Sequence, residues 1–519
     1  ILLIMTLNIL CYSQFAGGSG TTEDPYQIAT AEQLNNIRYN LTASYIQTAD
    51  IDLGVAPWNV GEGWDPIGDY DWADPNLSFR GNFNGNKYEI SNLFINRVDE
   101  SQLGLFGSTF GCVLTNIILQ NINITGQGTI GGIVAISYSD VISNCSVEGT
   151  IEGYALMGLL IYFFEGVSIE NCHVKGNIIG TGGSMIGGFG GMCHAQYVKN
   201  CTADVIISKN EGRFVGGFFA EIVNVRIIEN CSVNCIISSN DDFVGGLFAM
   251  QIQTTENLIV GNCYTTGTIN STGNNVGGFI GQIGLIETSP EYVSILNCYS
   301  TVDVTGNDLV AGFVAEYAGA ITDSTLIQNC YSTGQVTGNT NVGGFIGSID
   351  SLNTTFVYNS YWNTETSGQL ISAAGDGRTT AEMTLPYSGN TYVGWDFDTV
   401  WRDDTANQNN GYPTFKWVSG IEHNEDDFVT FEKGFELYQN YPNPFNPATK
   451  ISFVLSKASE VKLSVYNISG QLVSEPAKGV KNAGNHAVDF DGSELNSGIY
   501  YYTLEAEGMK LTQKMVLTK

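Results

Sequence analysis

The sequence is poor in basic residues. Its 21 lysines and arginines stand against 52 aspartates and glutamates among 519 residues, for a formal net charge of −31. Residues 435–519 hold eight residues of each sign, so the acidic surplus lies in residues 1–434. A surface of this kind repels polyanions, which argues against nucleic acid or anionic lipid as a partner.

Residues that mark metal and catalytic sites are also sparse. The histidines His173, His194, His423 and His486 are isolated, and no C-x-x-C zinc spacing occurs. The sequence has no H-E-x-x-H, G-x-S-x-G or Walker motif, and no G-x-G-x-x-G in a βαβ setting. It therefore assigns no catalytic residue, no cofactor and no metal ligand.

Long apolar runs are missing beyond residues 1–10, which are too few to span a bilayer. With Cys11 to Gln14 behind them they resemble the core and cleavage site of a signal peptide, cut near Ser13 or Ala16. This predicts a signal peptide over residues 1–16, although the charged start and initiator Met of such a peptide are not seen. A lipoprotein would use Cys11, but Leu10 is larger than the residue that such sites prefer.

What the sequence does contain is a repeat. Its clearest copy joins Asn-Cys-Tyr-Ser-Thr-Gly at 329–334 to Val-Gly-Gly-Phe-Ile-Gly at 342–347. Copies aligned on the second glycine of the pair are 26 to 34 residues apart, with that glycine at Gly104, Gly132, Gly158, Gly188, Gly217, Gly246, Gly278, Gly312 and Gly344. A steady period of this size predicts a stacked array, because one unit alone cannot bury its apolar face.

Each unit is rich in Val, Ile, Thr, Tyr and Phe, separated by Gly, Asn, Ser and Thr. These residues favour three short strands and three turns per unit. We therefore predict a right-handed parallel β-helix of about nine or ten coils. Helical repeats would need amphipathic stretches that are absent, and a propeller blade would need a longer period.

Residues 17–103 are expected to form a cap and the first coils, since an open coil is an exposed sheet edge. Residues 30–33 have capping-box spacing and predict a short helix that ends near Tyr39, the one convincing helix of the chain. The repeats themselves span residues 104–365, and residues 366–420 are expected to end the solenoid. The Phe or Leu after each glycine pair, such as Phe345, is predicted to lie in the core.

Several motifs together resemble bacterial surface proteins with GLUG-motif repeats. They are the steps at residues 50–53 and 79–86, the Gly-Gly-Phe and Asn-Cys-Tyr-Ser-Thr-Gly repeats, and the closing residues 410–417. The resemblance covers residues 18–418 and implies a β-solenoid of an exported, adhesin-like chain, some of which are attached to peptidases. One coil departs from the pattern at residues 156–160, where the first glycine is missing.

Asn and Cys recur at one phase of the repeat. Asn-Cys pairs begin at residues 144, 171, 200, 230, 262, 297 and 329, and Asn359 precedes a serine. Stacked thiols in parallel register predict a ladder of small buried side chains, although disulfides such as Cys231–Cys235 or Cys193–Cys201 remain open in an oxidising compartment. The Asn column is expected to be structural, with amides hydrogen-bonded from coil to coil.

A β-helix enzyme acting on polysaccharides would need paired carboxylates. The best candidates are Asp241 with Asp242, and Asp303 with Asp308, all beside turn residues where Asp is common for backbone reasons. Residues 403–411 are acidic and turn-like but lack the alternating spacing of a calcium loop.

Residues 421–434 predict an acidic linker, and residues 435–519 predict a small antiparallel β-sandwich. The Tyr-Pro-Asn-Pro-Phe-Asn-Pro entry at 441–447, the Gly-Ile-Tyr step at 498–500 and the final six residues resemble the type A C-terminal sorting domain of the type IX (Por) secretion system of Bacteroidetes. This resemblance implies that the outer-membrane machinery recognises the domain. An ordinary carbohydrate-binding sandwich is the alternative.

Taken together, the sequence predicts a secreted or surface-displayed β-solenoid that binds glycans or proteins, with the type IX machinery as a partner and no transmembrane segment in the mature chain. An enzyme that degrades polysaccharides and a passive structural spacer are the alternatives.

Overall fold

The structure is a computed structural model of the whole chain. It describes residues 14–71, 74–183, 185–209, 212–252, 257–284, 292–318, 324–349, 354–418, 436–437, 440, 443–455, 459–468, 471–481, 484–506 and 509–519. The proposed cleavage site at Ser13, Cys11 and His423 lie outside these residues. The chain divides into two compact units, Ile1–Ser419 and Gly420–Lys519.

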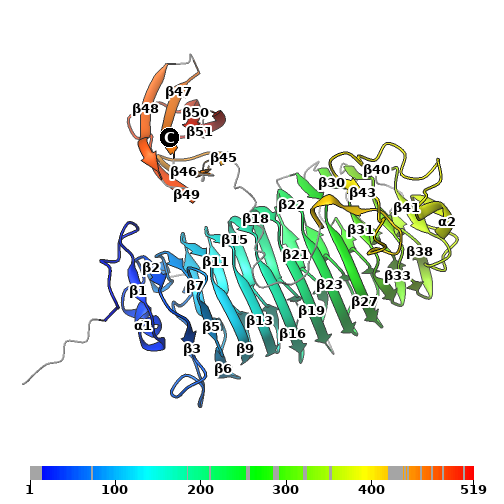
Figure 1. Cartoon of the computed structure of the whole chain (residues 1–519), viewed down its shortest axis with the longest axis horizontal. Coiled ribbons are helices and arrows are strands. Elements are labelled where there is room, and N and C mark those ends of the chain that lie inside the picture. The colour runs from blue at the N-terminus through cyan, green and yellow to red at the C-terminus, as the bar shows by residue number, and fades with distance from the viewer. Residues whose placement is uncertain are drawn as a thin grey trace, which may run out of the picture. The chain divides into compact units, whose positions relative to one another are not determined.

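The first unit is a parallel β-solenoid of about nine turns, as predicted. Successive coils follow one another along the axis from the N-terminal cap to the C-terminal end (Figure 1). From β10 onward the coils contribute strands to three sheets. The strand pairings of these sheets are parallel, and they keep one register except at an irregularity between β9 and β13. The periodicity of the sequence is therefore the periodicity of the stack.

The largest sheet, sheet A, contains β1 (Tyr26–Ile28), β2 (Tyr45–Gln47), β4 (Phe83–Asn84), β7 (Phe106–Phe110), β8 (Val113–Thr115), β11 (Val134–Tyr138), β12 (Val141–Ser143), β15 (Ile161–Glu170), β18 (Gly190–Lys199), β21 (Phe219–Val223), β22 (Ile227–Glu229), β25 (Phe248–Ile252), β26 (Leu258–Gly261), β29 (Ile280–Ile283), β30 (Tyr292–Leu296), β34 (Val314–Tyr317), β35 (Ser324–Gln328), β39 (Ile346–Ile349) and β40 (Thr354–Tyr358).

Sheet B contains β3 (Ile51–Asp52), β5 (Glu89–Ser91), β6 (Phe94–Arg97), β9 (Ile118–Gly126), β13 (Ser146–Gly153), β16 (His173–Gly180), β19 (Thr202–Lys209), β23 (Ser232–Ser239), β27 (Tyr264–Ser271), β31 (Tyr299–Ser300), β32 (Asp303–Thr305), β36 (Tyr331–Ser332), β37 (Val336–Thr337), β41 (Tyr361–Asn363) and β42 (Asp376–Arg378). Sheet C contains β10 (Thr129–Gly131), β14 (Leu156–Gly158), β17 (Met185–Gly187), β20 (Phe214–Gly216), β24 (Val244–Gly245), β28 (Val276–Gly277), β33 (Asp308–Ala311) and β38 (Thr340–Gly343).

The core is filled by the apolar residue that follows the glycine pair. Phe313 stacks between Phe279 and Phe345, with ring centroids 4.5 and 4.7 Å apart, and all three rings are fully buried. The second glycine of the pair makes this possible, because a Cβ on Gly278 would lie 2.3 Å from the Gly312 carbonyl of the next coil. The predicted core position of Phe345 is confirmed.

The glycine alignment was wrong in two coils. Gly158 stacks on Gly131 and Gly187, which are the first glycines of their pairs, and the second position is taken by Leu159. The peptide of Leu159 makes the hydrogen bonds that a second glycine makes elsewhere, to Gly132 and Gly188. Gly104 is likewise a first glycine, since the bridge of Leu103 to Ile130 places it level with Gly131. Counting glycines cannot separate the two positions, because only the inter-coil register distinguishes them.

The Asn column is structural, as predicted, for two reasons. Every Asn of the column from Asn116 to Asn359 has φ between 47° and 56°, the left-handed region that Asn tolerates better than other residues with a Cβ. Their amides also form a ladder, in which Asn200 Nδ2 donates to Asn171 Oδ1 at 3.0 Å and Asn230 Nδ2 donates to Asn200 Oδ1 at 3.1 Å.

The Cys column is a ladder of free, buried thiols. Ten cysteines lie in the described residues, and none of them forms a disulfide, including Cys193, Cys201, Cys231 and Cys235. The disulfide alternatives are therefore not formed. The seven thiols that follow the Asn column each donate to the carbonyl two residues earlier in their own coil, as Cys201 Sγ does to Lys199 O at 3.1 Å.

The N-terminal cap contains the predicted helix in shortened form. Helix α1 (Ala31–Asn35) begins at Thr30, whose hydroxyl accepts from Gln33 N, and continues as the 3₁₀ helix η1 (Asn36–Tyr39). The Phe15 ring stacks on Tyr26 at 4.5 Å and Ala16 N donates to Gln27 O, so the chain just before the cap packs onto it. A second 3₁₀ turn, η2 (Pro75–Leu77), follows within the next loop.

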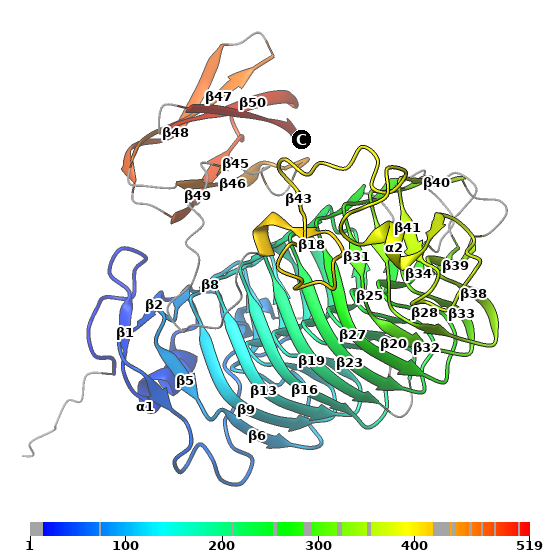
Figure 2. The same cartoon turned by 45° about the vertical axis from the view of Figure 1, so that its right-hand side comes forward.

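At the other end, residues 380–418 fold back over the outside of the solenoid (Figure 2). This strap contains α2 (Thr380–Met383), β43 (Trp401–Arg402), β44 (Thr414–Phe415) and η3 (Lys416–Val418), and β43 and β44 pair antiparallel. Helix α2 was not predicted, although Thr379 and Glu382 form a capping box before it. The strap covers stacked tyrosines of sheet B. Trp401 packs against both Tyr299 and Tyr331, which stack on each other, and Trp417 packs on Tyr264.

The second unit is a small antiparallel β domain, as predicted. One sheet contains β45 (Glu436–Leu437), β46 (Ala448–Leu455) and β49 (Gly484–Asp491), and the other contains β48 (Leu472–Lys481), β47 (Ser459–Asn467), β50 (Gly498–Ala506) and β51 (Met509–Leu517). The entry segment is tied down by Phe445, which is buried against Phe490, and by Asn443, whose Oδ1 accepts from Val516 N at 2.8 Å.

Candidate functional site

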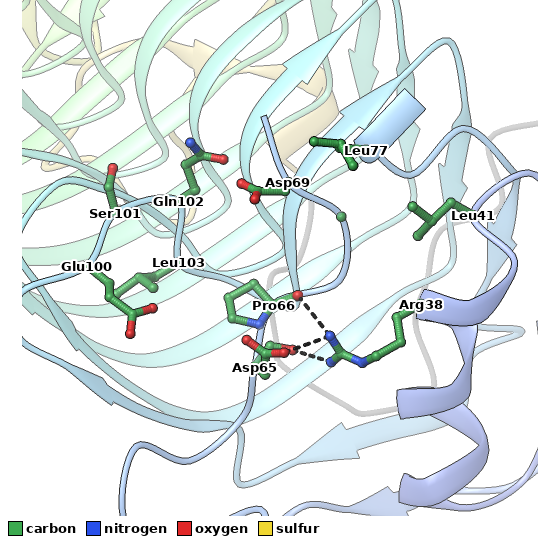
Figure 3. A pocket seen from close by; sticks show the side chains of 11 residues that line it. Arg38, Leu41, Asp65, Pro66, Asp69, Leu77, Glu100, Ser101, Gln102 and Leu103 are labelled. Atoms are coloured by element: carbon green, nitrogen blue, oxygen red, sulfur yellow. Dashed lines mark hydrogen bonds and ion pairs between the residues drawn. The ribbon is translucent and has the colours of Figure 1, made fainter. Parts of the chain in front are cut away.

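A polar cleft lies beside the N-terminal cap of the solenoid (Figure 3). We call it the cap cleft; its volume is about 290 Å³, and it is lined by Arg38, Leu41, Asp65, Pro66, Gly68, Asp69, Leu77, Glu100, Ser101, Gln102 and Leu103. Three separate stretches of chain supply these residues: the cap helix, the loop of residues 65–77, and the turn before β7. The sequence analysis did not predict this site, because no repeat or motif links the three stretches.

The part of this loop before residue 72 is held in place from both sides. On one side the Arg38 guanidinium donates to Asp65 Oδ2 at 2.8 Å and to Asp65 O at 2.6 Å. On the other side the Gln102 side chain brackets Tyr70, accepting from its N–H at 2.8 Å and donating to its carbonyl. Gln102 itself has φ of 64°, a conformation that few residues other than Gly adopt.

The lining of the cleft is mostly polar and offers both hydrogen-bond donors and acceptors, with Leu41 and Leu77 beside them. The exposed Asp69 and Glu100 carboxylates accept, Arg38 donates, and Ser101 can do both. Glu100 is paired with Arg97 at 3.0 Å, which limits its motion. Such a surface suits a ligand that carries several hydroxyl groups and an apolar face.

The structure separates the carboxylates that the sequence suggested for catalysis. Asp241 is buried inside the solenoid in contact with Lys209. Asp242 Oδ1 accepts from both nitrogens of Asn274, and Asp303 Oδ1 accepts from Gln335 N. Each of these carboxylates holds a turn of its own coil or of the next one.

Asp308 holds a turn as well. Its Oδ1 accepts from Thr340 and Asn341, and the Thr340 hydrogen bond lowers the pKa of the Asp308 carboxyl. No pair among the four candidate carboxylates is brought together over a cleft. The hypothesis of a polysaccharide-degrading enzyme therefore finds no site at these residues.

Asp404 stabilises the acidic turn at residues 403–411 through hydrogen bonds to its backbone. Its buried carboxylate accepts from the backbone N–H groups of Gln408, Asn409 and Gly411 at 2.7 to 2.9 Å. These bonds satisfy the carboxylate within the loop. In the part of the chain that the structure describes, no three His, Cys, Asp or Glu side chains come together as a metal site.

The described histidines are apart from one another. His173 Nδ1 lies 2.5 Å from the Thr202 hydroxyl of the next coil, and burial lowers the pKa of His194. His486 stacks on Phe453 in the second unit. They form no shared site.

Asp140 is a buried carboxylate that the sequence analysis missed. It lies at a corner of the second coil, accepts from Ser137 Oγ at 2.5 Å and from Cys112 N at 2.8 Å, and also accepts from the Thr109 hydroxyl. Burial raises the pKa of Asp140 to about 6, against the opposing effect of these hydrogen bonds. A single acid among Ser and Tyr residues gives no sequence signal of burial.

The second unit matches a known protein family. Residues 439–518 match the secretion system C-terminal sorting domain. This match confirms the prediction that the second unit is a secretion-system sorting domain. The sorting domain indicates that the protein is secreted or located at the outer cell surface, and it implies recognition by the type IX secretion machinery. No helix within the described residues has the length and apolar character needed to cross a membrane.

Curated relatives match only part of the chain. A Gly-rich membrane protein of Evansella cellulosilytica is 40% identical over 146 residues, which is 26% of this chain and 16% of that protein. Halomucin of Haloquadratum walsbyi is 38% identical over 152 residues, 28% of this chain and 2% of that protein. The matches thus span less than a fifth of either relative. Among solved structures, an IgA1 protease aligns with 61% of this chain and 23% of its own, at 19% identity and a TM-score of 0.36.

Proposed function

We propose that this protein is a surface-displayed adhesin-like β-solenoid that binds carbohydrate through the cap cleft. The observation that carries the proposal is the cleft itself, where charged and neutral hydrogen-bonding groups form most of the lining and lie beside the part-exposed Leu41 and Leu77. Display outside the cell supports it, because glycans are the polymers that such a protein meets there. We further propose that the solenoid is of the GLUG-repeat type and that the exporting organism belongs to the Bacteroidetes.

The negative charge of the chain limits the kinds of carbohydrate that the cleft would bind. The solenoid is strongly acidic, and Asp65, Asp69 and Glu100 all line the cleft. Acidic polysaccharides would be repelled, so a neutral or amino sugar suits the cleft better. Carboxylates are strong acceptors for sugar hydroxyls, and Arg38 and Gln102 supply donors. The exposed Leu77 and the half-buried Leu41 offer an apolar surface to the C–H face of a sugar ring.

The test is binding of the purified full chain to an array of neutral, amino and acidic glycans, followed by calorimetry on any glycan retained. We expect Asp69→Asn combined with Glu100→Gln to weaken binding by about tenfold or more, since each change removes a charged acceptor. Asp303→Asn is the matched control, because that exposed acid lies in a distant coil. Equal binding by both variants, or no binding to any glycan, would overturn the proposal.

A further inference from the structure

Lys209 and Asp241 form an ion pair inside the solenoid. Lys209 is the last residue of β19, and Asp241 lies in the turn after β23, the neighbouring strand of the next coil. Lys209 Nζ is 3.3 Å from Asp241 Oδ2, and neither side chain has any exposed surface. The contact therefore bridges two coils from within.

The packing around Lys209 isolates the amine from water. In the two preceding coils the equivalent position is Gly153 and Gly180, and the stem of Lys209 lies over Gly180. A Cβ on Gly212 would lie 2.1 Å from Nζ, so the backbone of that residue closes over the amine. Lys209 is thus a single long side chain in a column of small ones, directed at one carboxylate.

As an ammonium and a carboxylate, the two side chains would lack most of the hydrogen bonds that buried charges need. Lys209 Nζ and Asp241 Oδ1 have no well-formed hydrogen bond, although an ammonium carries three donors. Burial lowers the pKa of Lys209, against the pull of the Asp241 carboxylate, and this favours the neutral amine. A buried ion pair without such hydrogen bonds does not recover its desolvation cost.

Asp241 also has a group placed to assist reaction at its carboxyl carbon. The Ser239 hydroxyl donates to Asp241 Oδ2 at 2.6 Å and is itself oriented by Asp241 N, which donates to Ser239 Oγ at 2.9 Å. Oδ1 is left without a partner. One carboxyl oxygen is therefore polarised, and the other is free to depart.

We propose that Lys209 and Asp241 condense into an intramolecular isopeptide bond that cross-links two neighbouring coils. The ammonium first passes a proton to the carboxylate, leaving a neutral amine and a carboxylic acid. Nζ then attacks Cγ while Ser239 stabilises the charge that develops on Oδ2. The new C–N bond forms as the Cγ–Oδ1 bond breaks. Oδ1 leaves as water, carrying the proton that the carboxylate received first and one more that the nitrogen releases after the attack, and the amide nitrogen keeps its third proton. No oxidant, reductant or activating reagent is consumed.

The amide product removes the desolvation cost of burying two charged groups. An amide replaces two uncompensated charges, and its carbonyl keeps the hydrogen bond from Ser239. The link joins β19 and the turn after β23, so the two coils cannot separate by unzipping. This property is independent of what the cap cleft binds.

The direct test is the mass of the purified full chain, measured after denaturation. We expect the chain to be lighter than its sequence mass by one water molecule. Digestion with trypsin and chymotrypsin should yield a branched peptide that joins Lys209 to Asp241, with no tryptic cleavage after Lys209. A chain of full mass that trypsin cuts after Lys209 would overturn the proposal, and this result does not depend on any variant folding.

Variants test the assigned atoms. Asp241→Asn should form the same bond with loss of ammonia in place of water, and Lys209→Met should keep the full mass. Ser239→Ala should lower the cross-linked fraction at a fixed time after synthesis. Lys199→Met, which removes the half-buried lysine that precedes β19, should leave the bond intact. Loss of water from the Lys209→Met chain would show that the dehydration lies elsewhere and would also overturn the proposal.

Discussion

At the scale of single residues, the solenoid uses polar side chains as inter-coil connectors. Asn200 is the example: its backbone adopts the left-handed turn conformation, and its amide links it to Asn171 below and Asn230 above. The same position would be strained for most other residues and would leave amides unpaired. The turn conformation and the amide ladder therefore explain why Asn recurs in this column, without a role in ligand binding.

Two substitutions separate these two roles of Asn200. Asn200→Gly keeps the left-handed turn but removes the amide, so its cost in the free energy of unfolding measures the ladder, at about 1 kcal/mol. Asn200→Ala also imposes the left-handed penalty and should cost about 1–2 kcal/mol more. Urea denaturation of both variants checks the difference. Equal costs for Gly and Ala would contradict the conformational explanation.

Asp140 makes stability depend on pH. Its folded-state pKa is raised from 3.8 to about 6, so the folded protein holds the proton more tightly than the unfolded chain. This contribution to stability is fully present below pH 3.8 and is lost as the pH rises to about 6, a span of about 3 kcal/mol. Carboxyl groups whose pKa is lowered in the folded state make stability rise with pH instead. The contribution of Asp140 must therefore be measured as the difference between the wild type and a variant that lacks this carboxyl.

The measurement compares the wild-type chain with Asp140→Asn, whose side-chain carbonyl can still accept from Cys112 N. We expect the free energy of unfolding of the wild type to fall relative to that of the variant between pH 4 and about pH 6. Asp24→Asn, at an exposed acid, is the control and should show no such trend. Parallel pH profiles for the wild type and Asp140→Asn would refute the assignment.

At the scale of elements, each coil is stabilised mainly by its neighbours. Phe345 stacks on Phe313 and fills the core below the last glycine pair. We expect Phe345→Ala to lower the free energy of unfolding by about 3–5 kcal/mol, because a cavity replaces a buried ring. Ile206→Ala is the control, since that side chain is 46% exposed on sheet B and its loss should cost under about 1 kcal/mol. An unchanged thermal midpoint for Phe345→Ala would contradict the core assignment.

The N-terminal cap bears on where the proposed signal peptide is cut. Of the two predicted cleavage points, the one near Ser13 keeps Phe15, whose ring packs on Tyr26 and Tyr45, and the one after Ala16 discards it. We expect the exported chain to retain Phe15, because losing it would expose the aromatic end of the cap. Mass spectrometry of the protein recovered from the host surface decides this, and a chain that begins at Gly17 would contradict it.

At the scale of the whole molecule, two units carry separate tasks. The first has its own continuous core, and the second has a core of its own around Phe453, Leu463 and Tyr502. Residues 435–519 have balanced charge, so the acidic surplus lies in residues 1–434. We therefore expect that the sorting domain takes no part in the folding of the solenoid.

Deletion of residues 435–519 tests that division. We expect the truncated chain to fold, to cross the inner membrane and to accumulate in the periplasm, because the sorting domain is what the type IX machinery recognises. Fractionation of a host that has this system, with the full chain as control, gives the distribution. Normal display of the truncated chain would show that the domain is not the export signal. Its loss by proteolysis would show that the units depend on each other for folding.

The sequence by itself determined the features that recur in every coil of the solenoid. A parallel, in-register solenoid places equivalent residues of successive coils against one another, so a period in the chain becomes a column in space. The ladders of Asn and Cys, the buried Phe345 and the all-β architecture follow from that rule. The sorting domain was recognisable for a different reason, since its entry motif and final strand lie within one short unit.

Only the tertiary structure decided what lies outside the period. The cap cleft joins three stretches with no shared spacing, and the strap crosses tyrosines of several coils. Lys209 stands where the two preceding coils have glycine. Asp241 has the sequence context of a surface turn, but the turn directs its side chain inward to Lys209. Register also decided which glycine of a pair Gly158 is. The cap cleft, the strap and the Lys209–Asp241 contact depend on side-chain direction at irregular positions, and the place of Gly158 depends on inter-coil register. A period in the sequence encodes neither.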